Sequence, residues 1–318
     1  MDMSVVAVGR EDDSPVEEPL RVTVLADRLG YREVWAGEGP TWDSFVLATA
    51  IGAATERVAL TAGPVPVNVR DPLTVVRGAA STAAVTGRPV GVALGTSSKR
   101  VVEGVHGRPR TRPATTLEET AAAVRALMDS VPGEPVVPGS GFARRLPPPG
   151  GMLTVAAFGE RAVATAVGHA DRMLFDLVSP GQVRMLRARM LAAAEKAGRT
   201  PPRLAAWLPA AVAPEPESFT QILRSVVGYL PVPGYSDMFV DAGFAEVVEL
   251  AAKGADRDTL LRALPPEAAG TVALVGDAAT VRARVAAYAE AGLDEIALVP
   301  ATAGDPAGER TLTALRPK

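Results

Sequence analysis

Apolar and polar positions follow a repeating order along the chain: a short apolar run, a loop of small residues, then a longer segment with helical spacing. In Leu20–Leu29, for example, the apolar residues recur every three to five positions and Gly30 ends the pattern. Short apolar runs bounded by Gly and Pro predict buried strands. The predicted strands cover residues 4–8, 33–36, 58–62, 90–94, 153–157, 172–175, 204–213 and 294–299.

Eight strands that alternate with helices predict an α/β fold, a (β/α)8 TIM barrel. A doubly wound sheet is the alternative, although it rarely uses eight such units in one layer. In a barrel the loops that follow the strands share one face, and functional residues are expected there.

Two segments interrupt the alternation. Residues 129–152 are rich in Pro and Gly, which disfavour long regular structure, and the alternation resumes directly afterwards. We interpret them as an insertion on the barrel rim after the fourth helix. Residues 217–269 are mostly helical in pattern and form an excursion before the last strand–helix unit. Residues 1–318 are therefore expected to form a single TIM-barrel domain.

Composition narrows the function classes. Hydrophobic residues make up 47% of the 318 residues, the net charge is −3, and the basic residues are dispersed, which argues against a nucleic-acid surface. The chain has no cysteine and only two histidines, so neither a thiolate nor a histidine-rich metal site is expected. No run of 18 apolar residues and no signal-peptide pattern is present. We expect a cytoplasmic protein without a membrane or nucleic-acid partner.

Two loops have the composition of anion sites. The strand at 90–94 ends in Gly95-Thr96-Ser97-Ser98, whose amides and hydroxyls suit a phosphate or a flat ring. After the strand at 153–157, Phe158-Gly159-Glu160-Arg161 opens a helix with free amides and a basic side chain. An ordinary strand-to-helix turn is the alternative for each loop taken alone.

Three other residues are candidates for the chemistry. Glu38 and Trp42 lie in a glycine-containing loop, where the acid can donate a proton or anchor a ligand and the indole can stack on a ring. His106 is flanked by glycines and titrates near neutrality when unperturbed. The alternatives are a solvated acid, an indole packed at the rim and a solvated histidine. Gly63, in a proline-rich loop, allows another molecule to approach the main chain closely.

Several stretches together resemble the luciferase-like monooxygenase superfamily, in particular the branch assigned to the deazaflavin coenzyme F420. Singly they are weak, but their order and spacing extend from about residue 20 to about residue 300. These stretches are residues 30–43 (GYREVWAGEGPTWD), 54–58 (ATERV), 94–98 (LGTSS), 103–107 (EGVHG) and 291–295 (AGLDE).

The resemblance implies a barrel that binds F420 across its C-terminal face and transfers a hydride between the cofactor and a small organic substrate, commonly as a homodimer. It also implies a cis peptide bond behind the ring, at Gly63–Pro64 or, if the register slips, at Val65–Pro66. Glu38, Trp42 and His106, singled out above from their own loops, are the candidate catalytic residues. The implied cofactor-binding residues are Gly63, Pro64, Gly95, Thr96, Ser97, Ser98, Ala157, Phe158, Gly159, Glu160 and Arg161.

One departure leaves the function open. Some deazaflavin-dependent dehydrogenases have a histidine after an acid in the loop of Glu38, where this chain has Gly39. An FMN-dependent monooxygenase and a barrel that has lost turnover are therefore the alternatives.

Overall fold

The strands are all parallel and close into a barrel. The computed structural model describes residues 1–10, 12, 14–40, 42–133, 139, 141–143, 145–232 and 234–317. The strands are β1 (Asp2–Ala7), β2 (Glu33–Ala36), β3 (Ala59–Pro66), β4 (Val90–Gly95), β5 (Gly150–Ala156), β6 (Arg172–Asp176), β7 (Arg203–Val212), β8 (Leu274–Gly276) and β9 (Glu295–Pro300).

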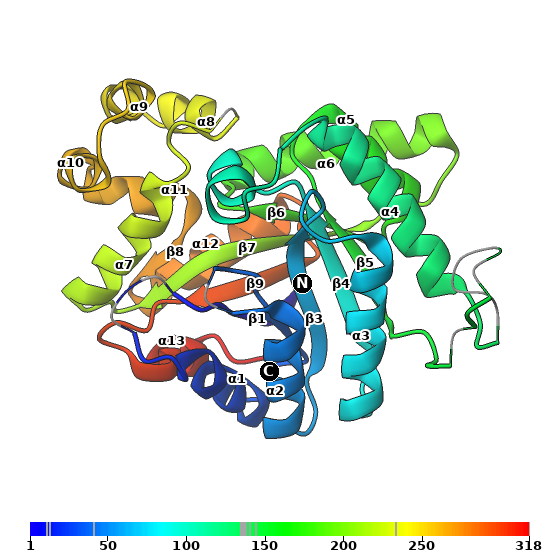
Figure 1. The fold of residues 1–318 in the computed structure, drawn as a ribbon. Coiled ribbons are helices and arrows are strands. Elements are labelled where there is room, and N and C mark those ends of the chain that lie inside the picture. The colour runs from blue at the N-terminus through cyan, green and yellow to red at the C-terminus, as the bar shows by residue number, and fades with distance from the viewer. Residues whose placement is uncertain are drawn as a thin grey trace.

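Each of β1 to β5 pairs with the next strand in sequence. β6 also pairs with β7, β7 with β9, and β9 with β1, which closes an eight-stranded ring. β8 is a short addition beside the far end of β7, in register with Ala210–Val212. The eight predicted strands and the TIM barrel are confirmed, and Figure 1 shows the helices packed around the ring.

Helices connect successive strands on the outside of the barrel. Where the chain provides an Asp or Ser before the first turn, that side chain caps the helix, as Asp277 does by accepting a hydrogen bond from the Thr280 amide. The helices are α1 (Glu18–Arg28), α2 (Ser44–Ala54), α3 (Pro72–Thr86), α4 (Pro113–Asp129), α5 (Glu160–His169), α6 (Pro180–Ala197), α7 (Pro216–Val227), α8 (Tyr235–Asp241), α9 (Ala245–Ala252), α10 (Arg257–Ala263), α11 (Ala269–Val272), α12 (Ala278–Glu290) and α13 (Glu309–Ala314).

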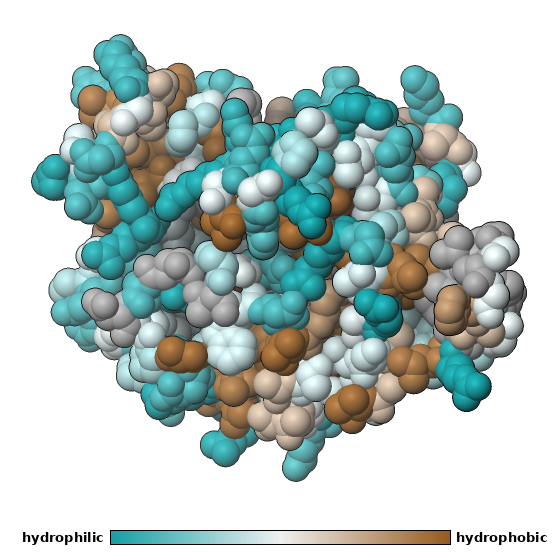
Figure 2. All heavy atoms as spheres, in the orientation of Figure 1, coloured by the Kyte–Doolittle hydropathy of each residue, from teal (hydrophilic) through white to brown (hydrophobic). Residues whose placement is uncertain are grey.

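Helices α7 to α11 make up the excursion expected at residues 217–269. They rise beside the C-terminal ends of the strands at the upper left of Figure 1. Their buried apolar residues, among them Phe239 and Leu230, form a cluster distinct from the main core. In Figure 2, apolar atoms are visible on this lobe between hydrophilic ones.

The sequence pattern missed three elements. Residues 100–105, expected in a long loop, form the π-helix η1 (Arg100–Val105), and α13 and β8 follow no clear apolar repeat. The rim insertion lies between the end of α4 and the start of β5. Of that segment, residues 134–138, 140 and 144 are outside the described residues. Within the described part of the chain, we find no helix with the length and apolarity needed to span a bilayer.

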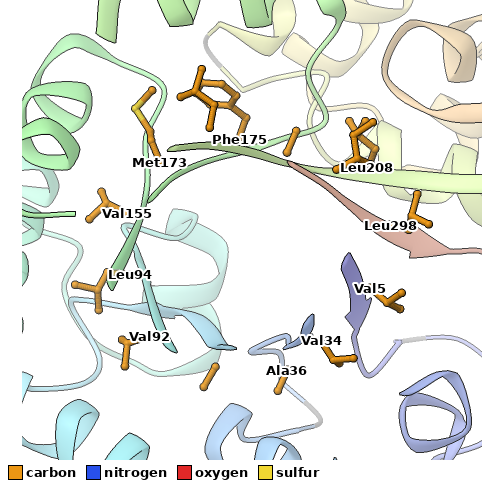
Figure 3. Packing of buried hydrophobic residues seen from close by; sticks show 14 of the residues in the cluster. Val5, Val34, Ala36, Val92, Leu94, Val155, Met173, Phe175, Leu208 and Leu298 are labelled. Atoms are coloured by element: carbon orange, nitrogen blue, oxygen red, sulfur yellow. The ribbon is translucent and has the colours of Figure 1, made fainter. Parts of the chain in front are cut away.

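Alternate residues of each strand point to opposite sides of the barrel wall. Val5, Val34, Val92, Val155 and others point outward to the helices and form the main core, as Figure 3 shows. The inward-pointing residues fill the barrel in layers, and an apolar middle layer contains Val6, Trp35, Ala93 and Leu174.

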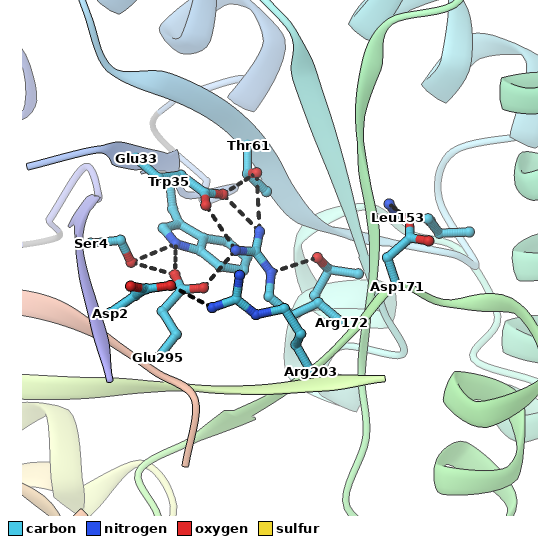
Figure 4. Close-up of polar contacts among 11 residues, drawn as sticks. Asp2, Ser4, Glu33, Trp35, Thr61, Leu153, Asp171, Arg172, Arg203 and Glu295 are labelled. Atoms are coloured by element: carbon cyan, nitrogen blue, oxygen red, sulfur yellow. Dashed lines mark hydrogen bonds and ion pairs between the residues drawn. The ribbon is translucent and has the colours of Figure 1, made fainter. Parts of the chain in front are cut away.

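The layer of inward-pointing residues at the N-terminal end of the barrel is polar. Arg172 on β6 is fully buried and pairs with Glu33 through two hydrogen bonds of 2.7 and 2.9 Å, and with Glu295 at 2.8 Å. Its Nε donates to the Thr154 hydroxyl, and its guanidinium lies 4.0 Å from the centre of the Trp35 ring. Figure 4 shows the guanidinium surrounded by these partners.

These ion pairs tie β2 and β9 to β6 across the barrel. Burial disfavours the charged form of Arg172, but the hydrogen bonds and charges of Glu33 and Glu295 outweigh it and raise the pKa of the guanidinium. We call this cluster of Arg172, Glu33, Glu295 and Thr154 the floor. Its guanidinium stays charged because two carboxylates lie against it.

We expect Arg172→Ala to lower the free energy of unfolding by about 3–5 kcal/mol, because it leaves two carboxylates buried without a cation. The matched control is Arg203→Ala. Arg203 is the register partner of Arg172 on β7, but its side chain is 46% exposed and pairs only with Asp2 in the described contacts. Its loss is expected to cost less than about 1 kcal/mol. Urea unfolding measures both, and equal losses would contradict the role of the floor.

Candidate active site

Glycines mark the C-terminal ends of β2 to β5. Gly37 follows β2, Gly63 lies in β3, Gly95 ends β4 and Gly159 lies just beyond β5. Because these strands are parallel, the four glycines gather at one end of the barrel, as the sequence predicts. These glycines let neighbouring segments pack closely at this end: a Cβ on Gly37 would lie 2.4 Å from Val8 Cγ1, and one on Gly95 would lie 3.4 Å from Pro64 Cβ.

β3 bends where it reaches the mouth. Its register with β4 shifts between Ala62 and Val65, and the Gly63–Pro64 peptide bond is cis, which confirms the prediction. Gly63 has φ of 114°, and a Cβ there would lie 2.4 Å from the Ala93 carbonyl oxygen. Only glycine fits this position, so the bend and its close approach to β4 depend on it.

The loop after β4 is braced by a residue that sequence reasoning missed. Arg110 Nε donates to the carbonyl oxygens of Ser97 (3.0 Å) and Thr96 (3.3 Å), and its Nη2 donates to the Thr96 hydroxyl at 3.2 Å. Ser97 adopts φ of 53°, and the Ser98 hydroxyl accepts from the Val101 amide. Lys99 points to solvent beside Glu103. Nothing in the run around Arg110 distinguishes it from its arginine neighbours.

The loop after β5 presents an open helix start. Gly159 is the N-cap of α5, no side chain caps the helix there, and a Cβ on Gly159 would meet no atom within 4 Å. Glu160 and Arg161 are exposed, and Arg161 donates to the Thr115 hydroxyl on α4 at 2.9 Å. Ala157 is buried, and Phe158 stacks on Tyr235 with ring centres 4.8 Å apart.

Glu38 belongs to an ion-pair cluster with Arg70 and Asp43. Arg70 Nη2 lies 2.6 Å from Glu38 Oε1 and 2.5 Å from Asp43 Oδ2, and Glu38 Oε2 accepts from the Ser44 amide at 2.9 Å. The Glu38 side chain is only 9% exposed. The cluster joins the loops after β2 and β3, and in it both oxygens of Glu38 accept hydrogen bonds.

Trp42 and His106 have different surroundings. Trp42 packs against the main core and borders a cavity of about 330 Å³ beside the ends of β1 and β9, together with Arg10, Glu18 and Thr302. His106 follows η1 and is exposed. The structure thus places Glu38 and Trp42 on one loop at the mouth and His106 on the surface of another. Thr41, between Glu38 and Trp42 in sequence, is outside the described residues.

The ends of β6 and β7 carry functional groups instead of glycines. Asp176 ends β6, and its Oδ2 accepts a 2.5 Å hydrogen bond from the Tyr229 hydroxyl. Burial raises the pKa of Asp176 to about 6, with the Tyr229 hydroxyl and the Leu177 amide opposing the shift only in part. Its register partner Trp207 has a buried Nε1 without a hydrogen-bond partner in the described part of the structure. The predicted strand ends at residue 175, and the sequence does not single out Asp176, because its partner Tyr229 is 53 residues away.

A search of the described residues for three or more clustered His, Cys, Asp or Glu side chains that would hold a metal ion found none.

We expect Asp43→Asn to lower the free energy of unfolding at neutral pH but not in acid. Burial works against the charge of Asp43, but hydrogen bonds from Arg70 and from the Val46 amide outweigh it, so its pKa is lowered. A lowered folded-state pKa stabilises the protein above the unfolded-state pKa of about 4, and this contribution is lost as pH falls through the folded-state value. Because asparagine also caps helices, the α2 cap is kept.

Urea unfolding at neutral pH and at about pH 3 measures this difference. Asp241→Asn is the control, since Asp241 is exposed and makes no ion pair in the described contacts. A difference between wild type and Asp43→Asn that does not shrink in acid would contradict the assignment.

Several solved structures share this fold. Coenzyme F420 dependent tetrahydromethanopterin reductase from Methanopyrus kandleri superposes with a TM-score of 0.80 at 16% identity, covering 99% of this chain and 98% of that one. An F420-dependent secondary alcohol dehydrogenase in complex with an F420-acetone adduct gives 0.76 at 16% identity, covering 99% of each chain. The FMN-bound oxygenating constituent of 3,6-diketocamphane monooxygenase from Pseudomonas putida gives 0.67 at 14%, covering 99% and 96%.

At these identities the likeness establishes the fold alone. No curated protein is significantly similar in sequence. The family model for luciferase-like monooxygenases, however, matches residues 1–295, most of the chain. The chain belongs to the luciferase-like monooxygenase family.

Proposed function

We propose that the protein is an oxidoreductase that transfers a hydride between the deazaflavin coenzyme F420 and a small organic substrate at the barrel mouth. The observation that carries the proposal is the combination, at the barrel mouth, of glycines at the strand ends with an uncapped helix start beside them. On the β2–β5 side the strand ends carry Gly37, Gly63 and Gly95, which add no side-chain bulk where a flat ring would lie. Beside it, the uncapped start of α5 offers free amides to a phosphate.

The residues present suit such a cofactor. Gly63 and Pro64 would lie behind the ring, and Gly95, Thr96, Ser97 and Ser98 beside it. Because no side chain caps α5 and the space beside Gly159 is open, the phosphate would bind at the α5 start. Residues 157–161 (Ala157, Phe158, Gly159, Glu160 and Arg161) form that end of the site. When bound, a deazaflavin supplies a two-electron hydride donor or acceptor, and the protein positions it.

The substrate-side residues are assigned from the same geometry. Glu38, held by Arg70, is an anchor that accepts hydrogen bonds, and Trp42 is the apolar wall of the adjoining cavity. His106 is the second candidate for proton transfer, since its exposed position leaves the imidazole accessible to a substrate. A homodimer is expected from the family resemblance, and sedimentation equilibrium tests it.

FMN-dependent monooxygenation is the second candidate function, because the diketocamphane monooxygenase neighbour shares this fold and is in complex with FMN. The glycines at the strand ends suit either ring. The two functions differ in the cofactor bound and in the use of oxygen.

Titration of the purified protein with F420 and with FMN, followed by fluorescence, is expected to give saturable binding of F420 with FMN weaker. Tighter binding of FMN, with oxygen consumption, would favour monooxygenation instead. Absence of binding for both would support a barrel that has lost turnover.

Gly159→Asp tests where the phosphate binds. An aspartate at the N-cap occupies the α5 amides and repels an anion, so cofactor affinity is expected to fall by about tenfold or more, equivalent to about 1.4 kcal/mol. The melting temperature is expected to stay the same or rise, because the new side chain caps α5 and meets open space.

Two variants serve as controls. Gly159→Asn provides a neutral cap and is expected to weaken binding less. Gly181→Asp adds the same charge to the first turn of α6, where Gly181 is exposed, and is expected to leave affinity unchanged. Equal affinity in Gly159→Asp and wild type would place the phosphate elsewhere.

A further inference from the structure

The second half of the barrel mouth carries a carboxyl group with no cation beside it. Arg172, Leu174 and Asp176 alternate along β6 and point into the barrel, with Arg172 in the floor, Leu174 in the middle layer and Asp176 at the mouth. Asp176 is only partly covered. In the ring of strands β2 faces β6, and Gly37, which follows β2, brings no side chain to that position.

The groups around Asp176 are hydroxyls and apolar side chains. From the segment after α7, the Tyr229 hydroxyl donates to Oδ2 (2.5 Å), and from the first residue of α8 the Tyr235 hydroxyl donates to the Asp176 carbonyl oxygen (2.8 Å). On β7 its register partner is Trp207. The charged group nearest on its own strand, Arg172, is already paired with two carboxylates of the floor.

The Asp176 charge and burial keep the pKa of the Tyr229 hydroxyl well above its usual value, so Tyr229 remains protonated and donates. The carboxyl group is the member of the pair whose proton is exchanged near neutral pH, since its own pKa is about 6. Beside the pair, the unpaired Nε1 of Trp207 is a donor that an oxygen atom of a ligand or a water molecule would satisfy.

A purely structural role explains these contacts less well. Holding the α7–α8 segment needs only a hydrogen-bond acceptor, and an asparagine would supply one without the cost of a buried ionisable group. A carboxyl group at the C-terminal end of a barrel strand, hydrogen-bonded to a tyrosine hydroxyl and not paired with a cation in the described contacts, has the position and the chemistry of an acid–base group.

We propose that Asp176 and Tyr229 form the proton-transfer pair of this enzyme, delivering a proton to the oxygen of a carbonyl substrate and recovering it in the reverse direction. The proposal rests on the hydride-transfer function proposed above. Reduction of a C=O group adds a hydride, supplied by the reduced deazaflavin-class cofactor, to carbon. The π-electron pair moves to oxygen, which takes the Tyr229 proton as Tyr229 takes the Asp176 proton. The products are an alcohol and the Asp176 carboxylate.

This role predicts that the rates of reduction and of oxidation change with pH in opposite directions. Reduction needs protonated Asp176, so its rate falls as pH rises through about 6, whereas oxidation of the alcohol needs the carboxylate and rises over the same range.

The test compares wild type with Asp176→Asn, Tyr229→Phe and the control Asp171→Asn. Asp171 lies just before β6, at the opposite end of the barrel, and pairs with Arg125 at 2.6 Å. Infrared difference spectra of the cofactor-free proteins are expected to show a carboxylic-acid carbonyl band that titrates near pH 6 in wild type and in Asp171→Asn. In Asp176→Asn the band is expected to be absent, and in Tyr229→Phe it is expected to shift.

Single-turnover reduction by reduced F420 is then followed with the ketones and aldehydes, from acetone upward, that the wild type reduces. Asp176→Asn is expected to slow this step by about 100-fold or more and to abolish its pH dependence, while F420 affinity is unchanged. Tyr229→Phe is expected to slow it in the same direction, and Asp171→Asn to leave rate and pH profile unchanged.

Failure of the proton-transfer role can be distinguished from failure of the proposed function. A wild type that binds neither cofactor or reduces no carbonyl compound overturns the proposed function and the proton-transfer role together. A wild type that is active, with Asp176→Asn unchanged in rate or pH profile, or without the infrared band, overturns only the role of the pair.

Discussion

The buried guanidinium of Arg172 is the interaction on which the barrel depends. A charge with no exposed surface is tolerated only when its partners match it in number and geometry. Glu33, Glu295, Thr154 and Thr61 accept its hydrogen bonds, and the face of Trp35 covers it. Five strands therefore meet at one side chain, and Gly91 on β4 leaves room for it, since a Cβ there would lie 2.5 Å from the Thr61 hydroxyl oxygen.

Fixing the floor leaves the opposite end of the barrel free for ligands. The mouth carries glycines on one side and an acid, two tyrosines and an indole on the other. The Glu38–Arg70–Asp43 cluster fixes the loops after β2 and β3 at the surface, where its charges need less compensation. Polar residues thus have separate tasks at the two ends: the Arg172 ion pairs stabilise the floor, and Asp176 lies at the mouth without an ion pair in the described contacts.

The features that the sequence predicted correctly are those that depend on residues close together in the chain. Apolar runs, prolines and glycines marked the eight strands, and the glycines at strand ends lie together at one end of the barrel, as predicted. The family resemblance added the cis bond at Gly63–Pro64. Contacts between distant segments escaped prediction. Tyr229 meets Asp176 across 53 residues, and Arg110 differs from its arginine neighbours only by its contacts with Thr96 and Ser97. The π-helix at residues 100–105 follows a hydrogen-bonding pattern that apolar spacing does not reveal.

The floor also has a consequence for how the chain folds. Its hydrogen bonds join residues far apart in sequence: Ser4 with Glu295 across 291 positions, and Arg172 with Glu33 across 139. The bonds to Glu295 cannot form until the last strand has arrived, and closing loops of this length costs chain entropy before any contact compensates for it. A growing chain on the ribosome therefore carries Arg172 and Glu33 in a solvated, open sheet, and the charges become buried only when β9 closes the ring. Barrel closure and desolvation of the charges are one late event in folding.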